Sequence, residues 1–506
     1  MSDKGRNTKI LTNTILLYIR SAIVLILTLY TSRVVLYTLG IEDFGLYNVV
    51  GGVVTLFAFL RTSMTKSTQR FLNVEMVNPN GDLNKTFCVS MNIHIAISLI
   101  ALLLTETVGL YFLNSYIQIP SGREFAANII YQSTIFSLVF TIISVPYTAD
   151  IIAHEEMGYL ALVSIVDAIL RLFIAFAITW SDIDNLIMYG FLMAGVSALN
   201  LLMYYIYCRV KYDECIFRIV KNIRKTKEML GYTTWTIVGQ AAILGTNQGN
   251  NILVNIFHGV TANATMGIAH QVNSGIATLT SNFQTAFNPQ ITKSYALKDY
   301  DYLKKIVFTT SKISYTLLII VSLPVMFNIK YLLGLWLVEI PNNSEEFCIL
   351  ILCNSILNAL SAPFNFTVLS SGKIKWFQIF TSIAFLSDLV ILYPLFLLGF
   401  PAITVLIVKL FSMFLVLYVR IYFAHREVDC IRLGSYFKDV LLPLTISTIL
   451  PVAVGLLMFA VVQNTFQILC ATMLLIGLTL TSILYLGLTM SERTSLLKLV
   501  RKFVKL

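Results

Sequence analysis

Apolar stretches of about 20 residues follow one another along almost the whole chain, and short polar segments separate them. An α-helix rises about 1.5 Å per residue, so each stretch is long enough to cross the ~30 Å hydrocarbon core of a bilayer. The pattern predicts an all-α polytopic membrane protein with about 14 transmembrane helices. We expect the spans near residues 11–36, 44–64, 87–114, 125–152, 159–180, 185–208, 231–257, 262–289, 306–335, 346–370, 375–399, 402–423, 437–462 and 466–488.

Composition agrees with this class and excludes several others. Of the 506 residues, 57% are hydrophobic and only 12% are charged, about half the charged share of a soluble domain. The first apolar stretch is interpreted as a retained helix, because Arg residues interrupt it and no small-residue cleavage site follows. The seven Cys are scattered without a CxxC or a paired His, so we expect no metal, disulfide or cofactor. The sequence lacks a GxxxxGK[ST] phosphate loop, which argues against ATP hydrolysis by that route.

The positive charges lie in alternate inter-helix segments. The formal net charge is +10, but its distribution follows the positive-inside rule and does not form a nucleic-acid-binding patch. The most basic segment, residues 209–227, lies on the same side as both termini, whereas the opposite segments hold Arg123 and several acids, among them Asp43 and Asp184. We therefore expect both termini to be cytoplasmic, and we expect no nucleic-acid partner.

The chain contains an internal repeat. A shift of about 219 residues overlays the first span on the seventh and places Gly40 over Gly259, and a shift of about 217 places SVPYTAD (Pro146) over SAPFNFT (Pro363). Six spans is an even number, so the halves are parallel repeats about an axis along the membrane normal, with a cavity between two lobes. The predicted parts are an N-terminal lobe (1–208), a basic cytoplasmic linker that forms an amphipathic helix (209–230), a C-terminal lobe (231–424), and two appended spans with a basic tail (425–506).

Polar residues form stripes along the seventh and eighth spans. At about 100° per residue, each span places its amides and hydroxyls on one helical face. Isolated residues of this kind commonly join helices in a dry bundle, but two full-length stripes favour the wall of a wet cavity. The residues of this predicted wall are Gln240, Asn247, Asn251, Asn255, Ser274, Ser281 and Gln284.

Three arginines lie within the first two spans. Arg20 shares a face with polar residues about 14 Å into its helix, and a central Arg that faces lipid costs ~3 kcal/mol or more. Arg20 is therefore predicted to face a cavity. Arg33 and Arg61 lie near span ends, where they can reach the membrane surface instead, and they are the further candidates for a cationic site.

Other charges within spans have simpler interpretations. Asp167 and Arg171 are spaced as an intrahelical ion pair, and Asp388 could neutralise Lys409 across neighbouring helices. Three residues are candidates for coupling transport to an ion or proton: Glu106, His270 and Asp388. No catalytic set emerges, and His154-Glu155-Glu156 is interpreted as a solvated turn. We therefore do not expect an enzyme.

Fourteen spans in a six-plus-six repeat with two extra helices resemble the polysaccharide transporters of the multidrug/oligosaccharidyl-lipid/polysaccharide exporter superfamily. Within it, the sequence is most similar to the O-antigen repeat-unit flippases, often called Wzx-type proteins. The resemblance is carried by the Arg-bearing first span, the segment SRVVLYTLGIEDFGLYNV (residues 32–49), and the Pro-bearing spans 4 and 10. It implies two lobes around a V-shaped cavity that opens alternately to each side.

The resemblance also implies a substrate. This is a polyprenyl-diphosphate-linked oligosaccharide, an O-antigen or capsule repeat unit, moved from the inner to the outer leaflet of the bacterial cytoplasmic membrane. A diphosphate needs fixed cations, which Arg20, Arg33 and Arg61 would supply as multidentate donors. The expected partners are this lipid, membrane lipids and polysaccharide polymerase machinery, and we expect a monomer.

Other functions stay open on the sequence alone. A cation-coupled multidrug exporter of the same superfamily would need an unpaired carboxylate, which Asp388, Glu106 or Asp167 could supply. A peptidoglycan-precursor lipid flippase would share both the architecture and the cavity arginines. A membrane enzyme such as a sugar-repeat polymerase would normally show a long extramembrane loop with clustered acids or His, and the sequence shows none.

Overall fold

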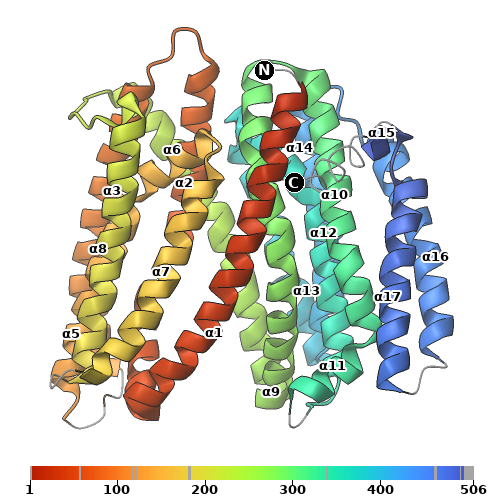
Figure 1. Ribbon diagram of the computed structural model, residues 1–506, viewed down its shortest axis with the longest axis horizontal. Helices are drawn as coiled ribbons and strands as arrows, with labels where there is room; N and C mark the ends of the chain where they lie inside the picture. Colours follow the sequence, from red (N-terminus) through yellow and green to blue (C-terminus); the bar gives the residue numbers. More distant parts are fainter. Residues whose placement is uncertain are drawn as a thin grey trace. The chain divides into compact units, whose positions relative to one another are not determined.

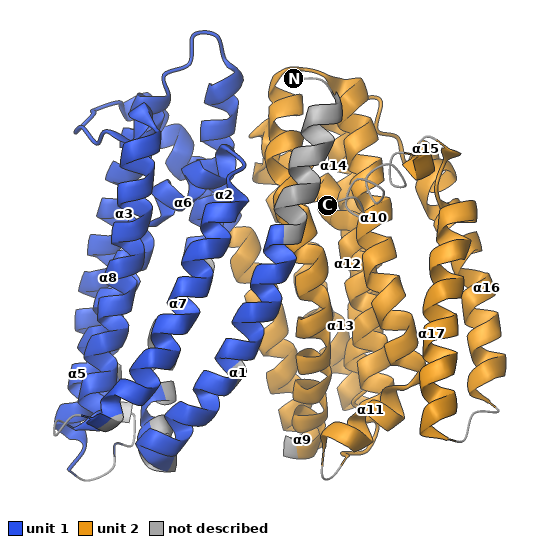
Figure 2. Ribbon diagram, viewed as in Figure 1, with its two compact units in different colours: residues 1–237 blue, residues 238–506 orange. Residues whose placement is uncertain are grey.

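The computed structural model describes residues 3–55, 58–116, 119, 122–180, 184–337, 340–460, 464–490 and 492–494. Helices make up nearly all of these residues, and no strand occurs among them (Figure 1). The all-α prediction is therefore confirmed. The chain divides into two compact units, residues 1–237 and residues 238–506 (Figure 2).

Unit 1 consists of long helices joined by short turns. Its elements are α1 (Asp3–Thr55), α2 (Ala58–Val77), α3 (Leu83–Leu104), the π-helix η1 (Thr105–Gly109), α4 (Leu110–Tyr116), α5 (Glu124–Ile143), α6 (Val145–Ala153), α7 (Met157–Ala177), η2 (Ile178–Trp180), α8 (Asn185–Lys211), η3 (Asp213–Cys215) and the start of α9 (Ile223–Ala296).

Unit 2 contains the rest of α9 and a second set of long helices. They are α10 (Tyr300–Phe327), α11 (Ile329–Trp336), α12 (Ser344–Ser371), α13 (Lys375–Leu397), α14 (Thr404–Glu427), α15 (Leu433–Tyr436), the π-helix η4 (Phe437–Leu441), α16 (Leu442–Phe459), α17 (Thr465–Ser482) and the π-helix η5 (Ile483–Gly487). The last two long helices, α16 and α17, pack on each other and on α10.

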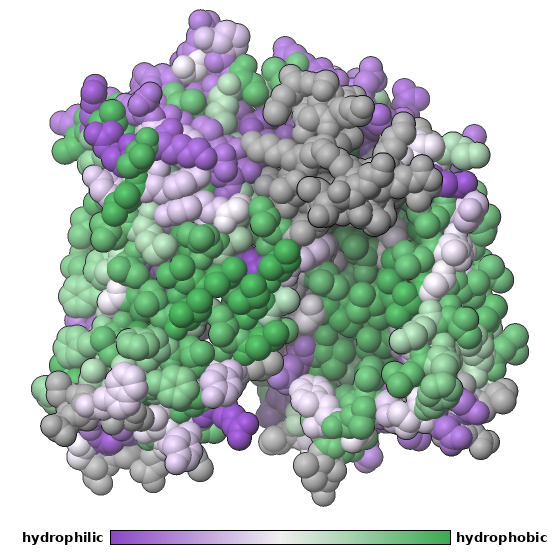
Figure 3. All heavy atoms as spheres, viewed as in Figure 1, coloured by the Kyte–Doolittle hydropathy of each residue, from purple (hydrophilic) through white to green (hydrophobic). Residues whose placement is uncertain are grey.

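Large apolar side chains lie on the outside of both units. Ile26, Phe173 and Phe191 in unit 1, and Val390 and Leu457 in unit 2, are all more than half exposed. Figure 3 shows a broad hydrophobic band in each unit, with hydrophilic residues gathered at the ends. Soluble monomers rarely expose apolar patches of this extent, so the band is the surface that faces lipid.

The helices account for the predicted spans. Eleven helical segments among the described residues are long and apolar enough to cross a membrane. Three more segments do not meet that criterion but correspond to the predicted second, seventh and eighth spans: the end of α1 beyond Gly40 with α2, and the two halves into which Gly259 divides α9. With these three, the described helices match the predicted number of about 14.

Two glycines mark the same point in each half of the repeat. Gly40 in α1 has φ 78° and ψ 171°, and Gly259 in α9 has φ 77° and ψ −174°. The packing repeats as well, because α5 packs on α8 in unit 1 as α12 packs on α14 in unit 2. The repeat differs at its prolines: the chain breaks at Ser144 before Pro146, whereas α12 continues through Pro363.

Substituting either glycine tests whether its backbone conformation requires glycine. We expect Gly40→Ala and Gly259→Ala each to lower the free energy of unfolding by about 1–3 kcal/mol, because this backbone region is nearly exclusive to glycine. A Cβ at either position meets no atom within 4 Å, so the cost comes from the backbone alone. Thermal unfolding in detergent measures the effect. Gly267→Ala is the control, since a Cβ at this helical position also meets no atom within 4 Å and Ala favours a helix. If Gly40→Ala is as stable as the wild type, the prediction is wrong.

The basic linker does not form the amphipathic helix that we expected. Residues 212–222 form only the short turn η3 and a non-helical segment, and α9 begins directly afterwards. Asn84 and Asn92 on α3 donate side-chain hydrogen bonds to carbonyl groups of this segment at 2.8–3.1 Å. These bonds satisfy linker carbonyls without intrahelical partners, so the segment is held against α3 instead of coiling.

The turn at residues 154–156 is also not solvated as we expected. Glu155 is buried and has a left-handed φ of 63°. His154 Nε2 lies 3.3 Å from Glu214 Oε1, and its Nδ1 lies 3.1 Å from the carbonyl oxygen of Asp150. Burial lowers the pKa of His154, but the hydrogen bonds to Asp150 and Glu214 outweigh it and raise the pKa to about 9.

At the opposite end of unit 1, Arg123 bridges two carboxylates. Its guanidinium donates hydrogen bonds to Asp184 and to Asp43. The bond to Asp184 raises the pKa of Arg123. Partial burial alone would raise the pKa of Asp184, but its hydrogen bonds with Arg123 and with the Ile187 N–H outweigh this effect and lower the pKa. The bridge ties the turn after the first span to the loops before α5 and α8.

We expect Arg123→Ala to cost about 1 kcal/mol or less at neutral pH, because exposed ion pairs contribute little. A lowered carboxyl pKa stabilises the fold above the unfolded-state pKa, and this contribution is lost as the pH falls through the folded-state value. The difference in melting temperature between wild type and variant should therefore disappear in strong acid. A difference that persists or grows there would show that the Asp184 charge is not the cause.

Candidate functional site

The arginine cluster of unit 1, which we define as Arg20, Arg61 and Arg171, gathers around α8. Tyr204 on α8 lies within electrostatic range of Arg20 from α1 and Arg61 from α2. Arg20 is half-buried, and Arg61 is exposed, with no described residue bonded to its guanidinium. Three helices, α1, α2 and α7, thus bring charged side chains to one tyrosine of α8.

The carboxylate of Asp167 belongs to this cluster. Arg171 Nε donates to Asp167 Oδ2 at 2.8 Å, which confirms the predicted ion pair within α7. Asn200 on α8 donates to the other carboxylate oxygen at 2.6 Å, and Asp167 is also within electrostatic range of Tyr204. Asp167 thus bonds both Arg171 and Asn200. The three guanidinium groups along α8 supply positive charge of the kind that binds phosphate and carboxylate groups.

Arg33 is not part of this cluster. It is exposed on α1, about 20 Å along the helix from Arg20 at 1.5 Å per residue and about 220° around it. The structure thus brings together two of the three arginines proposed from the sequence. A role for Arg33 in anion binding stays a prediction.

A second polar cluster lies inside unit 2. Lys409 Nζ on α14 donates to Asn247 Oδ1 on α9 at 2.9 Å. Asp388 on α13 is almost fully buried and lies beside Asn250 and Ser412, within electrostatic range of Lys409. The two charges do not form the direct ion pair that we expected, because Asn247 takes the ammonium group. Asp388 Oδ1 has no hydrogen-bond partner among the described residues.

The coupling candidate His270 belongs to the same cluster, since it lies within electrostatic range of Lys409. The remaining stripe residues divide between two environments. Gln284 donates to Ser314 Oγ at 3.5 Å, as expected for packed helices. Gln240, Asn247 and Asn251 are half-buried, and three others are exposed: Asn255, Ser274 and Ser281. Part of the stripe therefore joins helices, and part is exposed, so its role as a cavity wall stays a prediction.

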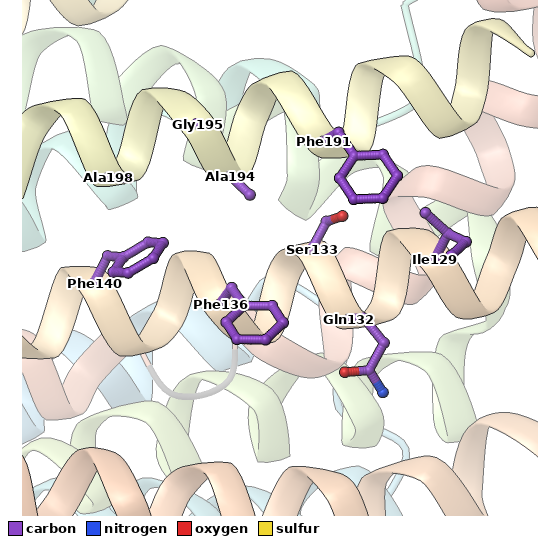
Figure 4. Close-up of a pocket in the computed structure, with 9 residues that line it drawn as sticks. All are labelled: Ile129, Gln132, Ser133, Phe136, Phe140, Phe191, Ala194, Gly195 and Ala198. Carbon is purple, nitrogen blue, oxygen red and sulfur yellow. The ribbon is translucent and has the colours of Figure 1, made fainter. Parts of the chain in front are cut away.

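Glu106 lies in the π-helix η1. Its Oε2 accepts a hydrogen bond from Gln132 Nε2 on α5 at 3.1 Å. Gln132 also lines a cavity of about 220 Å³ between α5 and α8, together with Ser133 and apolar side chains such as Phe136 and Phe191. Figure 4 shows Ser133 directed toward α8 and Gln132 directed away from it. π-turns are frequent at functional sites, which keeps Glu106 a candidate for coupling.

Comparison with known proteins finds similar structures but no similar sequence. No family model matches the chain, and no curated protein matches it. Among solved structures, an outward-facing multidrug resistance MATE family transporter of the MOP superfamily matches 84% of this chain and 96% of its own, with a TM-score of 0.70 and 11% identity. A MATE protein in the straight conformation has the same coverage and TM-score, with 12% identity.

A third structure is a MOP superfamily transporter from Pyrococcus furiosus, described as having a binding pocket of reversed polarity that suggests a different function. It matches 84% of this chain and 96% of its own, with a TM-score of 0.66 and 13% identity. The chain therefore has the fold of MATE transporters.

Proposed function

We propose that the protein is a flippase that moves a polyprenyl-diphosphate-linked oligosaccharide from the inner to the outer leaflet of the cytoplasmic membrane by alternating access. Under this proposal the basic ends of the helices face the cytoplasm, and polysaccharide polymerase machinery receives the flipped lipid. The observation that carries the proposal is the arginine cluster of unit 1, where Arg20 and Arg61 lie within electrostatic range of Tyr204 and Arg171 is bonded to Asp167.

Three features of the protein match the three parts of this substrate, which are the diphosphate, the sugar and the polyprenyl chain. Guanidinium groups bind phosphate oxygens as planar multidentate donors and keep their charge in a low-dielectric site. The amides and hydroxyls of α9 offer both donors and acceptors for sugar hydroxyls. The exposed apolar surface of the helices would leave the polyprenyl chain in lipid.

A cation-coupled multidrug exporter is the second candidate. It is favoured by the fold shared with a multidrug resistance transporter and by the buried Asp388, which lies beside two polar side chains in unit 2. Reversed pocket polarity has been taken to suggest a different function in another transporter of this fold. An arginine-rich cluster is likewise unfavourable for cationic drugs, because like charges repel.

Reconstitution in vesicles separates the two candidates. One set of proteoliposomes carries a fluorescent polyprenyl-diphosphate oligosaccharide, and a membrane-impermeant glycosidase reports which leaflet exposes the glycan. A second set measures efflux of a fluorescent cationic drug under imposed proton and sodium gradients. We expect flipping of the lipid without drug efflux. Drug efflux without lipid flipping would replace the proposal with the second candidate.

A further inference from the structure

A cluster of buried thiol, carboxylate and imidazole groups lies at the end of unit 1 that carries the 212–222 linker. Asp150 at the end of α6, Cys208 near the end of α8 and Cys215 in η3 are all buried. One side-chain donor atom from each of these three residues lies within 4.8 Å of the others. His154 and Glu214 meet the same carboxylate, and these two form with Asp150 a second group of the same dimensions.

The contacts within the cluster leave one acceptor unused. Cys215 Sγ lies 3.2 Å from Asp150 Oδ2, and Cys208 Sγ lies 3.6 Å from the Tyr147 carbonyl. Asp150 Oδ1 is buried and has no hydrogen-bond partner within the described part of the chain, and His154 Nδ1 lies 3.6 Å from it. A buried carboxylate oxygen without a partner is costly, and a bound cation would remove that cost.

We propose that Asp150, Cys208 and Cys215 bind a zinc-like divalent metal ion, with the fourth ligand supplied by the adjacent pair of His154 and Glu214. Two thiolates select a borderline-soft ion such as Zn²⁺ over Mg²⁺ or Ca²⁺, which prefer oxygen ligands.

The spacing and the charge of the cluster support this ion. Tetrahedral Zn²⁺ with bonds of about 2.0–2.3 Å separates its ligand atoms by roughly 3.3–3.8 Å, so the side chains need to close by only about 1 Å. Two carboxylates and one imidazole leave the cluster negative or neutral before the thiols ionise. Hydrogen bonding to Cys208, burial and the nearby Asp150 raise the pKa of the Cys215 thiol, so binding would release thiol protons, as metal binding to Cys does in general.

The ion would join three parts of unit 1. It would connect α6, the last turns of α8 and the linker, which also bonds to α3. Cys208 is one helical turn beyond Tyr204, so the site would also fix the end of the helix that carries this tyrosine. We assign the ion a structural role, because the surrounding groups fill its coordination without an open position for substrate.

Metal content of the purified full-length protein tests the proposal, after removal of any affinity tag and a wash with a weak chelator. We expect about one Zn²⁺ per chain in the wild type, and loss of that ion in Cys208→Ser and in Cys215→Ser. Cys88→Ser is the matched control, because Cys88 is a buried thiol that contacts the same linker but lies outside the group; it should retain the metal.

Two further readouts keep the test decisive if the serine variants misfold. Co²⁺ loaded into the wild type and into Cys88→Ser should give a thiolate-to-cobalt charge-transfer band, which carboxylate and imidazole ligands alone cannot produce. Zn²⁺ should also slow tryptic cleavage of the linker at Arg218 and Lys221. The proposal is wrong if the folded wild type contains no metal and shows no cobalt charge-transfer band. It is also wrong if the serine variants hold as much metal as the wild type, or if Cys208 and Cys215 form a disulfide in place of the ion.

Discussion

Arg20→Ala is expected to reduce flipping of the diphosphate lipid by about 10- to 100-fold. A hydrogen bond to a charged group contributes about 1.5–3 kcal/mol, and each 1.4 kcal/mol corresponds to about a factor of ten. Arg20 and Arg61 meet the same tyrosine, whereas Asp167 already serves Arg171 and Asn200. Removing Arg20 therefore removes one of the two guanidinium groups within electrostatic range of Tyr204. Initial rates in the glycosidase assay measure the effect.

Two variants show whether position or charge is responsible. Arg20→Lys keeps the charge but loses the planar fork, so it should recover only part of the rate. Arg218→Ala removes one positive charge from an exposed linker position and should flip lipid at the wild-type rate. If Arg218→Ala is as slow as Arg20→Ala, the effect comes from overall charge, and the assignment of Arg20 to the diphosphate is wrong.

Lys409→Met is expected to have the largest effect on stability, a loss of about 3–5 kcal/mol. Lys409 lies within electrostatic range of the buried Asp388, so its loss leaves a buried carboxylate with less compensation, and Asp388 Oδ1 has no hydrogen-bond partner among the described residues. Protonation of Asp388 limits the loss, because a neutral acid is far cheaper to bury than a carboxylate. Thermal unfolding in detergent measures the change.

The double variant Lys409→Met/Asp388→Asn measures the interaction between the two charges. It removes both charges, so it should recover most of the stability that the single variant loses. Lys330→Met is the control, since Lys330 is an exposed lysine of the same unit, and its loss should change little. If the double variant is no more stable than Lys409→Met, the two charges act independently, and Asn247 rather than Asp388 is the partner that matters.

Most of the fold could be predicted from the sequence, because lipid allows few solutions. Every backbone polar group must be satisfied within the membrane, so an apolar stretch of this length becomes a helix. Gly40 and Gly259 were aligned by the repeat alone, and they adopt the same backbone. The linker was harder to predict, because its conformation depends on Asn84 and Asn92 of α3.

The candidate sites were only partly predictable. A helical wheel identifies the face of one helix but not the neighbours that this face meets. The wheel indicated Arg20, and the charge within its span indicated Asp388, but neither identified Tyr204 within electrostatic range of Arg20 or Asn250 beside Asp388. An isolated tyrosine in an apolar span looks like a core residue. Asn250 lies three residues from Asn247, so a search of both flanks of the stripe would have included it.

The π-helix η1 is the place in the third span where one residue can be deleted without rotating the rest of the helix. Leu110 N–H bonds to the carbonyl of Thr105, five residues earlier, so this turn accommodates one residue more than an α-turn. Deleting one residue here would let α3 and α4 continue as one regular helix with the faces on either side unchanged. A deletion elsewhere in the span would instead rotate everything beyond it by about 100°. The third span thus holds one dispensable residue, at the place that sets Glu106 beside Gln132.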